Sequence, residues 1–262
     1  MKQRYQRSFL KLSTDGYISR FLLVSLNMDA ILQGTTVGSR RRKLNAMTDS
    51  LGLEGAYCET LSRVKGQGEE ESRLGMAALM WIFHAERPLK VDEMCHALGV
   101  EIGSPDLDTD NVPSIETVLA CCQGLVSVDR EASMVRLIHF TLQEYLQTHP
   151  ELFDRAHSTM AETCLSYLNS HQVKALSTTS FPNLRSRPLS RYFLYPGKAF
   201  LMYSSIYWGM HARRELSDRA KQLALSLFDD NCHISTEILL NSVESQLARG
   251  LVGKDFQGSA LH

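Results

Sequence analysis

The stretch that decides the fold reads Ser72-Arg73-Leu74-Gly75-Met76-Ala77-Ala78-Leu79-Met80-Trp81-Ile82-Phe83. Its apolar residues cover almost the whole circumference of a helix, which predicts a buried helix. Two shorter segments follow, and each carries apolar residues at positions i, i+3, i+4 and i+7. They are Val91, Met94, Cys95 and Leu98, and then Ile115, Val118, Leu119 and Cys122. The spacing predicts two more helices.

Two runs of alternating residues come next, Leu125 to Val128 and Met134 to Ile138. The polar segment 129–133 joins them, and this pattern predicts a β-hairpin. Three helices followed by a hairpin make a winged helix-turn-helix, in which the hairpin is the wing. We therefore expect a mainly α protein, with a winged helix-turn-helix and a small β-hairpin flanked by helical-hairpin segments.

The flanking sequence predicts further helices and a division into three domains. Helices are expected at 17–32, 39–46 and 52–64 before the winged helix, and at 142–148, 158–170, 199–215, 217–228 and 235–247 after it. Thr141 and Glu144 have the spacing of a capping box for the helix 142–148. Residues 171–191 read as a polar, proline-containing connection. The expected domains are an N-terminal helical segment (1–68), the winged helix domain (69–150) and a C-terminal helical domain (151–262).

Composition points to a cytoplasmic protein. The chain has 262 residues and 44% hydrophobic content, which is ordinary for a globular protein. The uncharged run 199–210 is too short to cross a bilayer, and no apolar segment follows the basic N-terminus as in a secretory signal. The six cysteines fall mostly within apolar helical patterns. They are expected to be reduced thiols in the core.

Charge is distributed unevenly along the chain. Residues 1–48 hold nine Lys or Arg and two acids, whereas residues 69–116 hold eleven acids and three bases. Opposed local charges favour docking within the chain over binding of an external polyanion. No aromatic residues are interleaved with the basic run 40–43, as nucleic-acid binding would favour. We therefore expect no membrane contact, and nucleic acid is a disfavoured partner.

The residues that would carry enzyme chemistry are missing from their motifs. Gly197-Lys198 and Gly253-Lys254 are the only Gly-Lys pairs, and neither stands in a phosphate-binding P-loop. There is no G-x-S-x-G, H-E-x-x-H or C-x-x-C motif. Cys95-His96 and Cys232-His233 lack a second pair at metal-ligand spacing. We expect no enzyme activity, no catalytic residue, no metal site and no cofactor.

The third predicted helix decides between DNA and protein as the partner of the winged helix. In DNA-binding winged helices this helix enters the major groove, and Lys and Arg supply much of the affinity. Residues 114–124 contain no Lys or Arg and one acid, Glu116, and the preceding loop carries Asp106, Asp108 and Asp110. Protein docking is favoured, and a DNA-binding winged-helix regulator is the alternative.

Four runs together are distinctive: 73–82 (RLGMAALMWI), 87–94 (RPLKVDEM), 121–126 (CCQGLV) and 135–146 (VRLIHFTLQEYL). They resemble the winged-helix region, named after GPI inositol-deacylase, of fungal NACHT–ankyrin proteins. These are signal-transducing STAND ATPases related to NOD-like receptors. The resemblance covers about residues 17–240, and residues 257–262 are similar to the start of an ankyrin repeat.

The resemblance implies a non-catalytic regulatory and interaction module. In the family, the P-loop lies upstream of the segment that corresponds to residue 17. The ankyrin array lies downstream of the segment that corresponds to residue 262. The chain is therefore expected to be a regulatory middle: a fragment, a split gene product or a reduced paralogue. Its implied partners are a NACHT ATPase core and ankyrin repeats, in cis or in trans.

His139 is the one candidate site residue. It lies between the second predicted strand and the following helix, near a helix N-terminus, where anions are favoured. The resemblance implies a role, because the matching histidine of the family contacts bound ADP and helps hold a closed state. His139 would then be a nucleotide sensor when a NACHT core is present. The alternative is a histidine that only hydrogen-bonds across the strand–helix junction.

Overall fold

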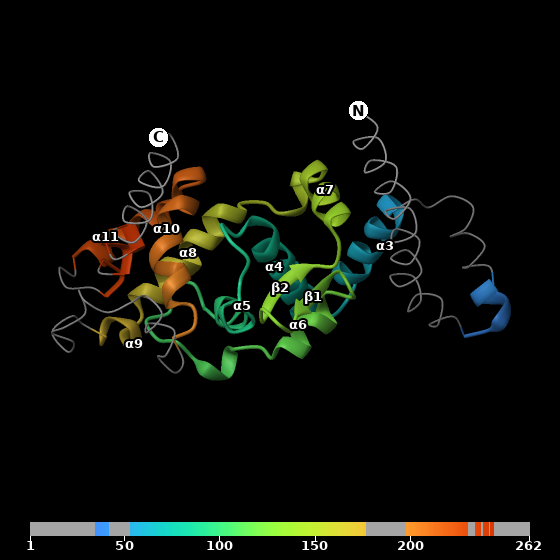
Figure 1. Cartoon of the computed structure of the whole chain (residues 1–262), viewed down its shortest axis with the longest axis horizontal. Coiled ribbons are helices and arrows are strands. Elements are labelled where there is room, and N and C mark those ends of the chain that lie inside the picture. The colour runs from blue at the N-terminus through green and yellow to red at the C-terminus, as the bar shows by residue number, and fades with distance from the viewer. Residues whose placement is uncertain are drawn as a thin grey trace, which may run out of the picture. The chain divides into compact units, whose positions relative to one another are not determined.

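The structure is a computed structural model of the chain that describes residues 35–41, 53–176, 198–229, 234–236, 238–240 and 242–243 (Figure 1). Within these residues the protein is mainly helical and has one two-stranded sheet. The chain divides into two compact units. The first unit takes residues up to 83 with 116–131 and 135–152, and the second takes 84–115, 132–134 and the residues from 153 onward.

The first unit is built mainly from four helices and the hairpin. The helices are α3 (Leu53–Lys65), α4 (Glu69–His84), α6 (Ile115–Cys121) and α7 (Phe140–Thr148), the last followed by a 3-10 turn at Pro150–Leu152. The hairpin pairs β1 (Val126–Asp129) with β2 (Met134–Leu137). Its core consists of fully buried apolar side chains at the predicted helical and strand spacings, among them Tyr57, Val64, Leu79, Val118, Leu125, Val135, Leu142 and Leu146.

Gly75 marks the closest approach of helices in the first unit. A Cβ added at Gly75 would lie 2.6 Å from the carbonyl oxygen of Cys121, at the end of α6, and 3.0 Å from Cγ1 of Val64. The Gln67 side chain donates a hydrogen bond to the same Cys121 oxygen (2.8 Å). Because Gly75 has no side chain, α4 can pack directly on the backbone of α6.

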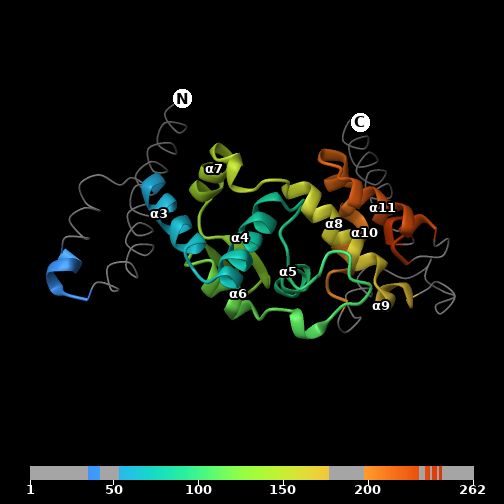
Figure 2. The same cartoon turned by 180° about the vertical axis from the view of Figure 1, so that it is seen from behind.

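The second unit is a helical assembly around α8 (Ala156–Asn169), which packs along α10 (Leu201–Arg214) and α11 (Asp218–Phe228) (Figures 1 and 2). It also contains α5 (Val91–Leu98), a 3-10 turn at Thr109–Asn111, and the short helix α9 (His171–Lys174). Most of α8 is buried, because neighbouring helices cover it on several sides. An antiparallel bridge joins Lys90, just before α5, to Met134 of the hairpin.

Hydrogen bonds anchor the acidic loop 101–113 to α8 and α9 within the second unit. The Gly103 N–H donates to Oγ of Ser166 (3.0 Å), and the Leu107 N–H donates to Oε1 of Gln172 (3.1 Å). The His171 N–H donates to the Pro105 carbonyl (2.8 Å). This loop therefore has a defined path over the helices.

The structure confirms the predicted fold class and the three helices and hairpin of the winged helix. The expected helices 52–64, 158–170, 199–215 and 217–228 are also present, with ends shifted by a few residues. The expected helix 17–32 lies outside the described residues. So do most of 39–46 and parts of 235–247, although the described residues in both stretches are mostly helical.

Two predictions of local structure were wrong. Thr141 is not the N-cap of the helix after the wing: the helix begins at Phe140, and His139 is its N-cap. Residues 171–174, expected in a polar connection, form α9, because Val173 is fully buried and anchors a helical turn. Residues 177–191 of that connection lie outside the described part of the chain.

Four of the five cysteines in the described residues are buried free thiols, as expected. Burial raises the pKa of the Cys122 thiol to about 12 and also raises the pKa of Cys164. Cys58 differs from the prediction, because it lies on the exposed side of α3. In the described residues, no helix combines the length and apolar character needed to cross a membrane.

Candidate functional site

His139 caps the N-terminus of α7. Its backbone is extended (φ −155°, ψ 153°), and its Nδ1 accepts a long hydrogen bond from the Thr141 N–H (3.4 Å). The first N–H groups of a helix have no partner within the helix, so an acceptor at this position satisfies one of them. Accepting this bond requires the tautomer in which Nδ1 is unprotonated and the ring proton is on Nε2.

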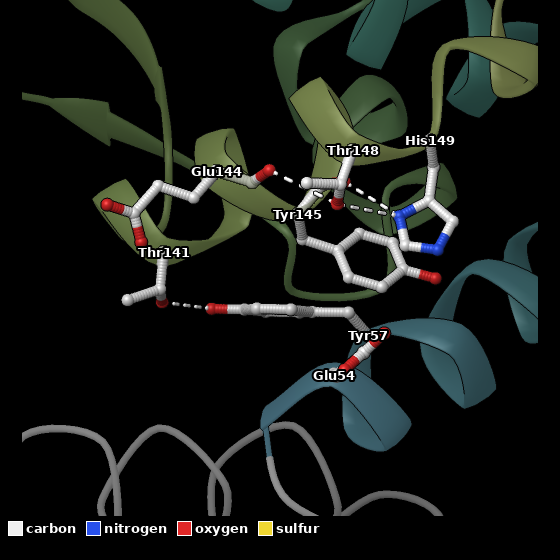
Figure 3. Close-up of a pocket in the computed structure, with 7 residues that line it drawn as sticks. All are labelled: Glu54, Tyr57, Thr141, Glu144, Tyr145, Thr148 and His149. Atoms are coloured by element: carbon white, nitrogen blue, oxygen red, sulfur yellow. Dashed lines mark hydrogen bonds between the residues drawn. The ribbon is translucent and has the colours of Figure 1, made fainter.

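Thr141 links this cap to α3. Its hydroxyl lies 2.8 Å from His139 Nδ1. The same hydroxyl lies 2.8 Å from the hydroxyl of Tyr57, as Figure 3 shows. Because Nδ1 is the acceptor, the consistent arrangement has Tyr57 donating to Thr141 and Thr141 donating to His139. Burial raises the pKa of Tyr57. The threonine predicted to cap the helix instead joins the buried Tyr57 to the capping histidine.

A groove of about 500 Å³ lies beside this network, between α3 and α7 (Figure 3). Its lining residues come from those two helices and the residue that follows α7: Glu54, Tyr57, Thr141, Glu144, Tyr145, Thr148 and His149. The rings of Tyr145 and His149 stack with centroids 4.1 Å apart. Tyr57 is almost fully buried, so it forms the floor, whereas Glu54 and Glu144 are exposed.

The groove is acidic and does not suit a phosphate group. Its lining includes two carboxylates and no Lys or Arg. Beyond the effect of burial, the charge of Glu144 raises the pKa of Tyr57, and that of Glu54 raises the pKa of Tyr145. His139, the residue singled out from the sequence, is not part of the lining. Sequence reasoning missed the groove, because its two walls are far apart in the chain.

The residues on either side of His139 present apolar surface. Ile138 is 37% exposed and Phe140 is 52% exposed, and the Phe140 ring lies 4.4 Å from the His139 ring, centroid to centroid. Exposed apolar side chains beside a half-buried polar one are typical of surfaces that bind protein. The junction of β2 and α7 is therefore a candidate contact surface.

The exposed face of α6 carries no positive charge. Val118 and Cys121 are buried, and the exposed positions are Glu116, Thr117 and Ala120. A helix that binds the major groove needs Lys or Arg near the phosphates. The structure thus places an acid and two uncharged residues where a DNA-binding winged helix would have its reading surface.

In the described residues, neither the acids of loop 101–113 nor the pair Cys95-His96 forms part of a metal-binding cluster. Asp106 lies 3.2 Å from His171, and the Asp108 carboxylate accepts the Asp110 N–H. Cys95 is buried on α5, and the neighbouring His96 is half-buried. Asp106 therefore serves a surface contact, and Asp108 serves a local turn.

Residues 63–166 match the family model described as GPI inositol-deacylase, winged helix domain. This segment is a winged helix domain of that type. The match runs from the end of α3 into α8 and includes the hairpin, His139 and α7. Comparisons with curated proteins and with solved structures found no match.

Proposed function

We propose that the chain is a non-catalytic regulatory module whose winged helix domain docks on protein rather than on DNA. The observation that carries the proposal is the surface of α6, which exposes Glu116 and no basic residue. The apolar positions Ile138 and Phe140 supply a second surface that suits a protein partner. The buried free thiols fit a reducing compartment, so we place the module in the cytoplasm.

The partner proposed is the ATPase core of a NACHT-type signalling protein, in cis or in trans, with ankyrin repeats as a further partner. Support comes from the match of residues 63–166 to a winged helix domain and from the sequence runs that resemble fungal NACHT–ankyrin proteins. The mechanism would be two-state docking, in which the winged helix packs on a nucleotide-loaded core and releases it when the nucleotide changes.

His139 is the proposed sensor of the nucleotide. Capping of α7 uses its Nδ1, which leaves the Nε2–H as the donor of the ring. That donor could reach a phosphate oxygen of a nucleotide held by the core. One such charge-assisted hydrogen bond is worth about 1.5–3 kcal/mol, so its loss would weaken the closed state roughly ten-fold or more.

The DNA alternative is tested with duplex DNA and the full chain at two salt concentrations. We expect weak binding without sequence preference, which disappears when the basic run is neutralised (R40Q/R41Q/R42Q/K43Q) and is unchanged in the matched variant E116Q. Electrostatic binding of this kind falls steeply with salt. A sequence-selective complex that resists salt and survives the neutralised run would refute protein docking as the role of α6.

The sensor role is tested in a protein in which this chain is joined to a NACHT core. Aspartate is a good N-cap and has no donor, so H139D keeps the acceptor for Thr141 and loses the ring donor, whereas H139A loses both. A sensor predicts faster ADP release in both variants. A purely structural histidine predicts normal release in H139D, together with a loss of thermal stability in H139A of the unjoined chain.

A further inference from the structure

Three histidines of the second unit form one cluster beyond the proposed docking surfaces. They are His84 at the end of α4, His157 in α8 and His211 in α10. The centroid of the His157 ring lies 5.0 Å from that of His84 and 5.2 Å from that of His211. The Nδ1 atoms of His157 and His211 are 2.9 Å apart. His211 is completely buried.

The hydrogen bonds limit how many protons the histidine pair can hold. Two ring nitrogens at 2.9 Å can form a hydrogen bond only if one of them carries a proton and the other does not. The Tyr203 hydroxyl accepts the Glu86 N–H (3.1 Å) and lies 2.9 Å from Nε2 of His211. One arrangement that satisfies these contacts has Tyr203 donating to Nε2 of His211 and the Nδ1–H of His211 donating to His157, with both histidines neutral.

The charged groups near the cluster include Arg214, Glu86 and Glu215. Arg214 pairs with Glu86, and Glu215 accepts the Ser158 N–H (3.0 Å). Arg87 lies over the Tyr203 ring, 5.3 Å from its centroid, and is itself bound to Glu93. Arg214 adds positive charge near the histidines, Glu86 and Glu215 are engaged with Arg214 and with the backbone, and Arg87 is neutralised by Glu93.

Burial is the main cause of the low proton affinity of the cluster. It lowers the pKa of His84 from 6.5 to about 4 and that of His211 from 6.5 to about 3, with further lowering by the neighbouring histidine and Arg214. The pKa of His157 is lowered by burial and Arg214, against which Glu86 and Glu215 act. Each histidine is thus harder to protonate in the folded protein than in the unfolded chain.

The cluster lies where the start of α8 meets the end of α10. Glu215 follows α10 directly and binds the backbone of Ser158 in the first turn of α8. Ser217, the N-cap of α11, donates from its hydroxyl to Glu162 of α8 (2.5 Å). The histidine pair is therefore one of three neighbouring links between α8 and the α10–α11 connection.

We propose that His84, His157 and His211 form an acid-sensitive latch, which holds the start of α8 against the end of α10 while the rings are neutral and releases it on protonation. A first proton on His157 can be accommodated by reversing the hydrogen bonds, because Nδ1–H of His157 can donate to His211. A second proton would place two N–H groups of two cations face to face at 2.9 Å, and the rings must separate.

The sign of the effect follows from proton linkage. The histidines have their ordinary pKa of 6.5 when unfolded and lower values when folded. The open state therefore binds more protons below pH 6.5, and the closed state is lost progressively as the pH falls. The opening constant is the equilibrium ratio of the open to the closed state. At pH 5, each histidine that is shielded from protons in the closed state raises this constant about 30-fold over its value at neutral pH. Two independent histidines raise it about 1,000-fold.

Hydrogen exchange of the full chain at pH 7.5 and pH 5, corrected for intrinsic exchange rates, tests the latch. We expect protection in α8 and α10 to fall at least 30-fold, with the amides of α3 in the first unit as the internal reference. Unchanged protection of α8 and α10 at pH 5 would overturn the proposal.

Two substitutions separate the latch from general acid sensitivity. H157Q keeps an acceptor for His211, and H84F keeps the ring contacts with Phe153 and His157; neither side chain titrates. The double variant keeps only His211 of the three, so it should lose the contributions of His84 and His157 to the acid response, whereas H171Q, at an exposed histidine of α9, should keep the whole response. If the double variant does not fold at pH 7.5, H84F alone must reduce the acid-induced change in the opening constant by up to about 30-fold, the contribution of one shielded histidine. A full response in these variants would refute the latch.

Discussion

Replacing Gly75 with alanine tests the closest contact in the winged helix. A Cβ at this position would lie 2.6 Å from the carbonyl oxygen of Cys121 and 3.0 Å from Val64. The oxygen belongs to the backbone and accepts the Gln67 side chain, so it cannot move without weakening that bond. Overpacking costs about 1–3 kcal/mol, whereas alanine gains about 1 kcal/mol over glycine as a helix former. Because the contact is this short, we expect overpacking to outweigh the gain in helix propensity, so that G75A lowers the free energy of unfolding by about 1–2 kcal/mol.

Urea denaturation followed by Trp81 fluorescence measures the effect, because Trp81 is buried in α4. The half-exposed Trp208 is replaced by phenylalanine to leave a single reporter. Gly209 in α10 is the matched control: no atom lies within 4 Å of a Cβ added there. G209A should therefore raise the free energy of unfolding by about 0.5–1 kcal/mol, as measured by circular dichroism. If G75A were as stable as the parent protein, the close packing of α4 on α6 would be refuted.

Three further outcomes are expected. Y57F should lose about 0.5–1.5 kcal/mol of stability, because it removes the hydrogen bond to Thr141; in a double-mutant cycle with T141V, additive losses would show that the two hydroxyls do not interact. E93Q should cost about 2–4 kcal/mol, since the nearly buried Glu93 neutralises Arg87 through two hydrogen bonds; a loss below about 1 kcal/mol would contradict a strong buried ion pair. In the native protein, Cys58 should react with iodoacetamide before the four buried cysteines, as peptide mass spectrometry would show; early labelling of a buried thiol would contradict the described core.

The pair of Arg136 and Asp129 in the hairpin is the control for E93Q. Their atoms are 3.1 Å apart, but the arginine is 55% exposed and the aspartate 31%. Solvent screens such a pair, so D129N should change the free energy of unfolding by less than about 1 kcal/mol.

The core of the winged helix could be predicted because burial alone decides it. Leu79, Val118 and Val135 stand at the helical and strand spacings that bury them, and no special side-chain geometry is required. The start of α7 was predicted two residues late. Thr141 is the commoner N-cap type, and only the structure shows its hydroxyl engaged with Tyr57 and His139.

Sites that depend on tertiary contacts could not be read from spacing. Glu93 looks like a surface acid of α5 in the sequence, yet it is 1% exposed because Arg87 and the Lys90 N–H bind it. His84 and His211 come together only when the helices pack. The sequence did single out His139 correctly as a residue at the helix N-terminus, and its nucleotide role stays a prediction.

The chain passes between the two compact units five times, at 83/84, 115/116, 131/132, 134/135 and 152/153. Neither unit is therefore a continuous segment that could be expressed by itself. A fragment that ended at residue 150, the boundary expected from the sequence, would keep loop 101–113 and lose its anchors Ser166 and Gln172. Interaction studies should thus use point substitutions in the whole chain, since a truncation would damage the second unit while appearing to spare the winged helix.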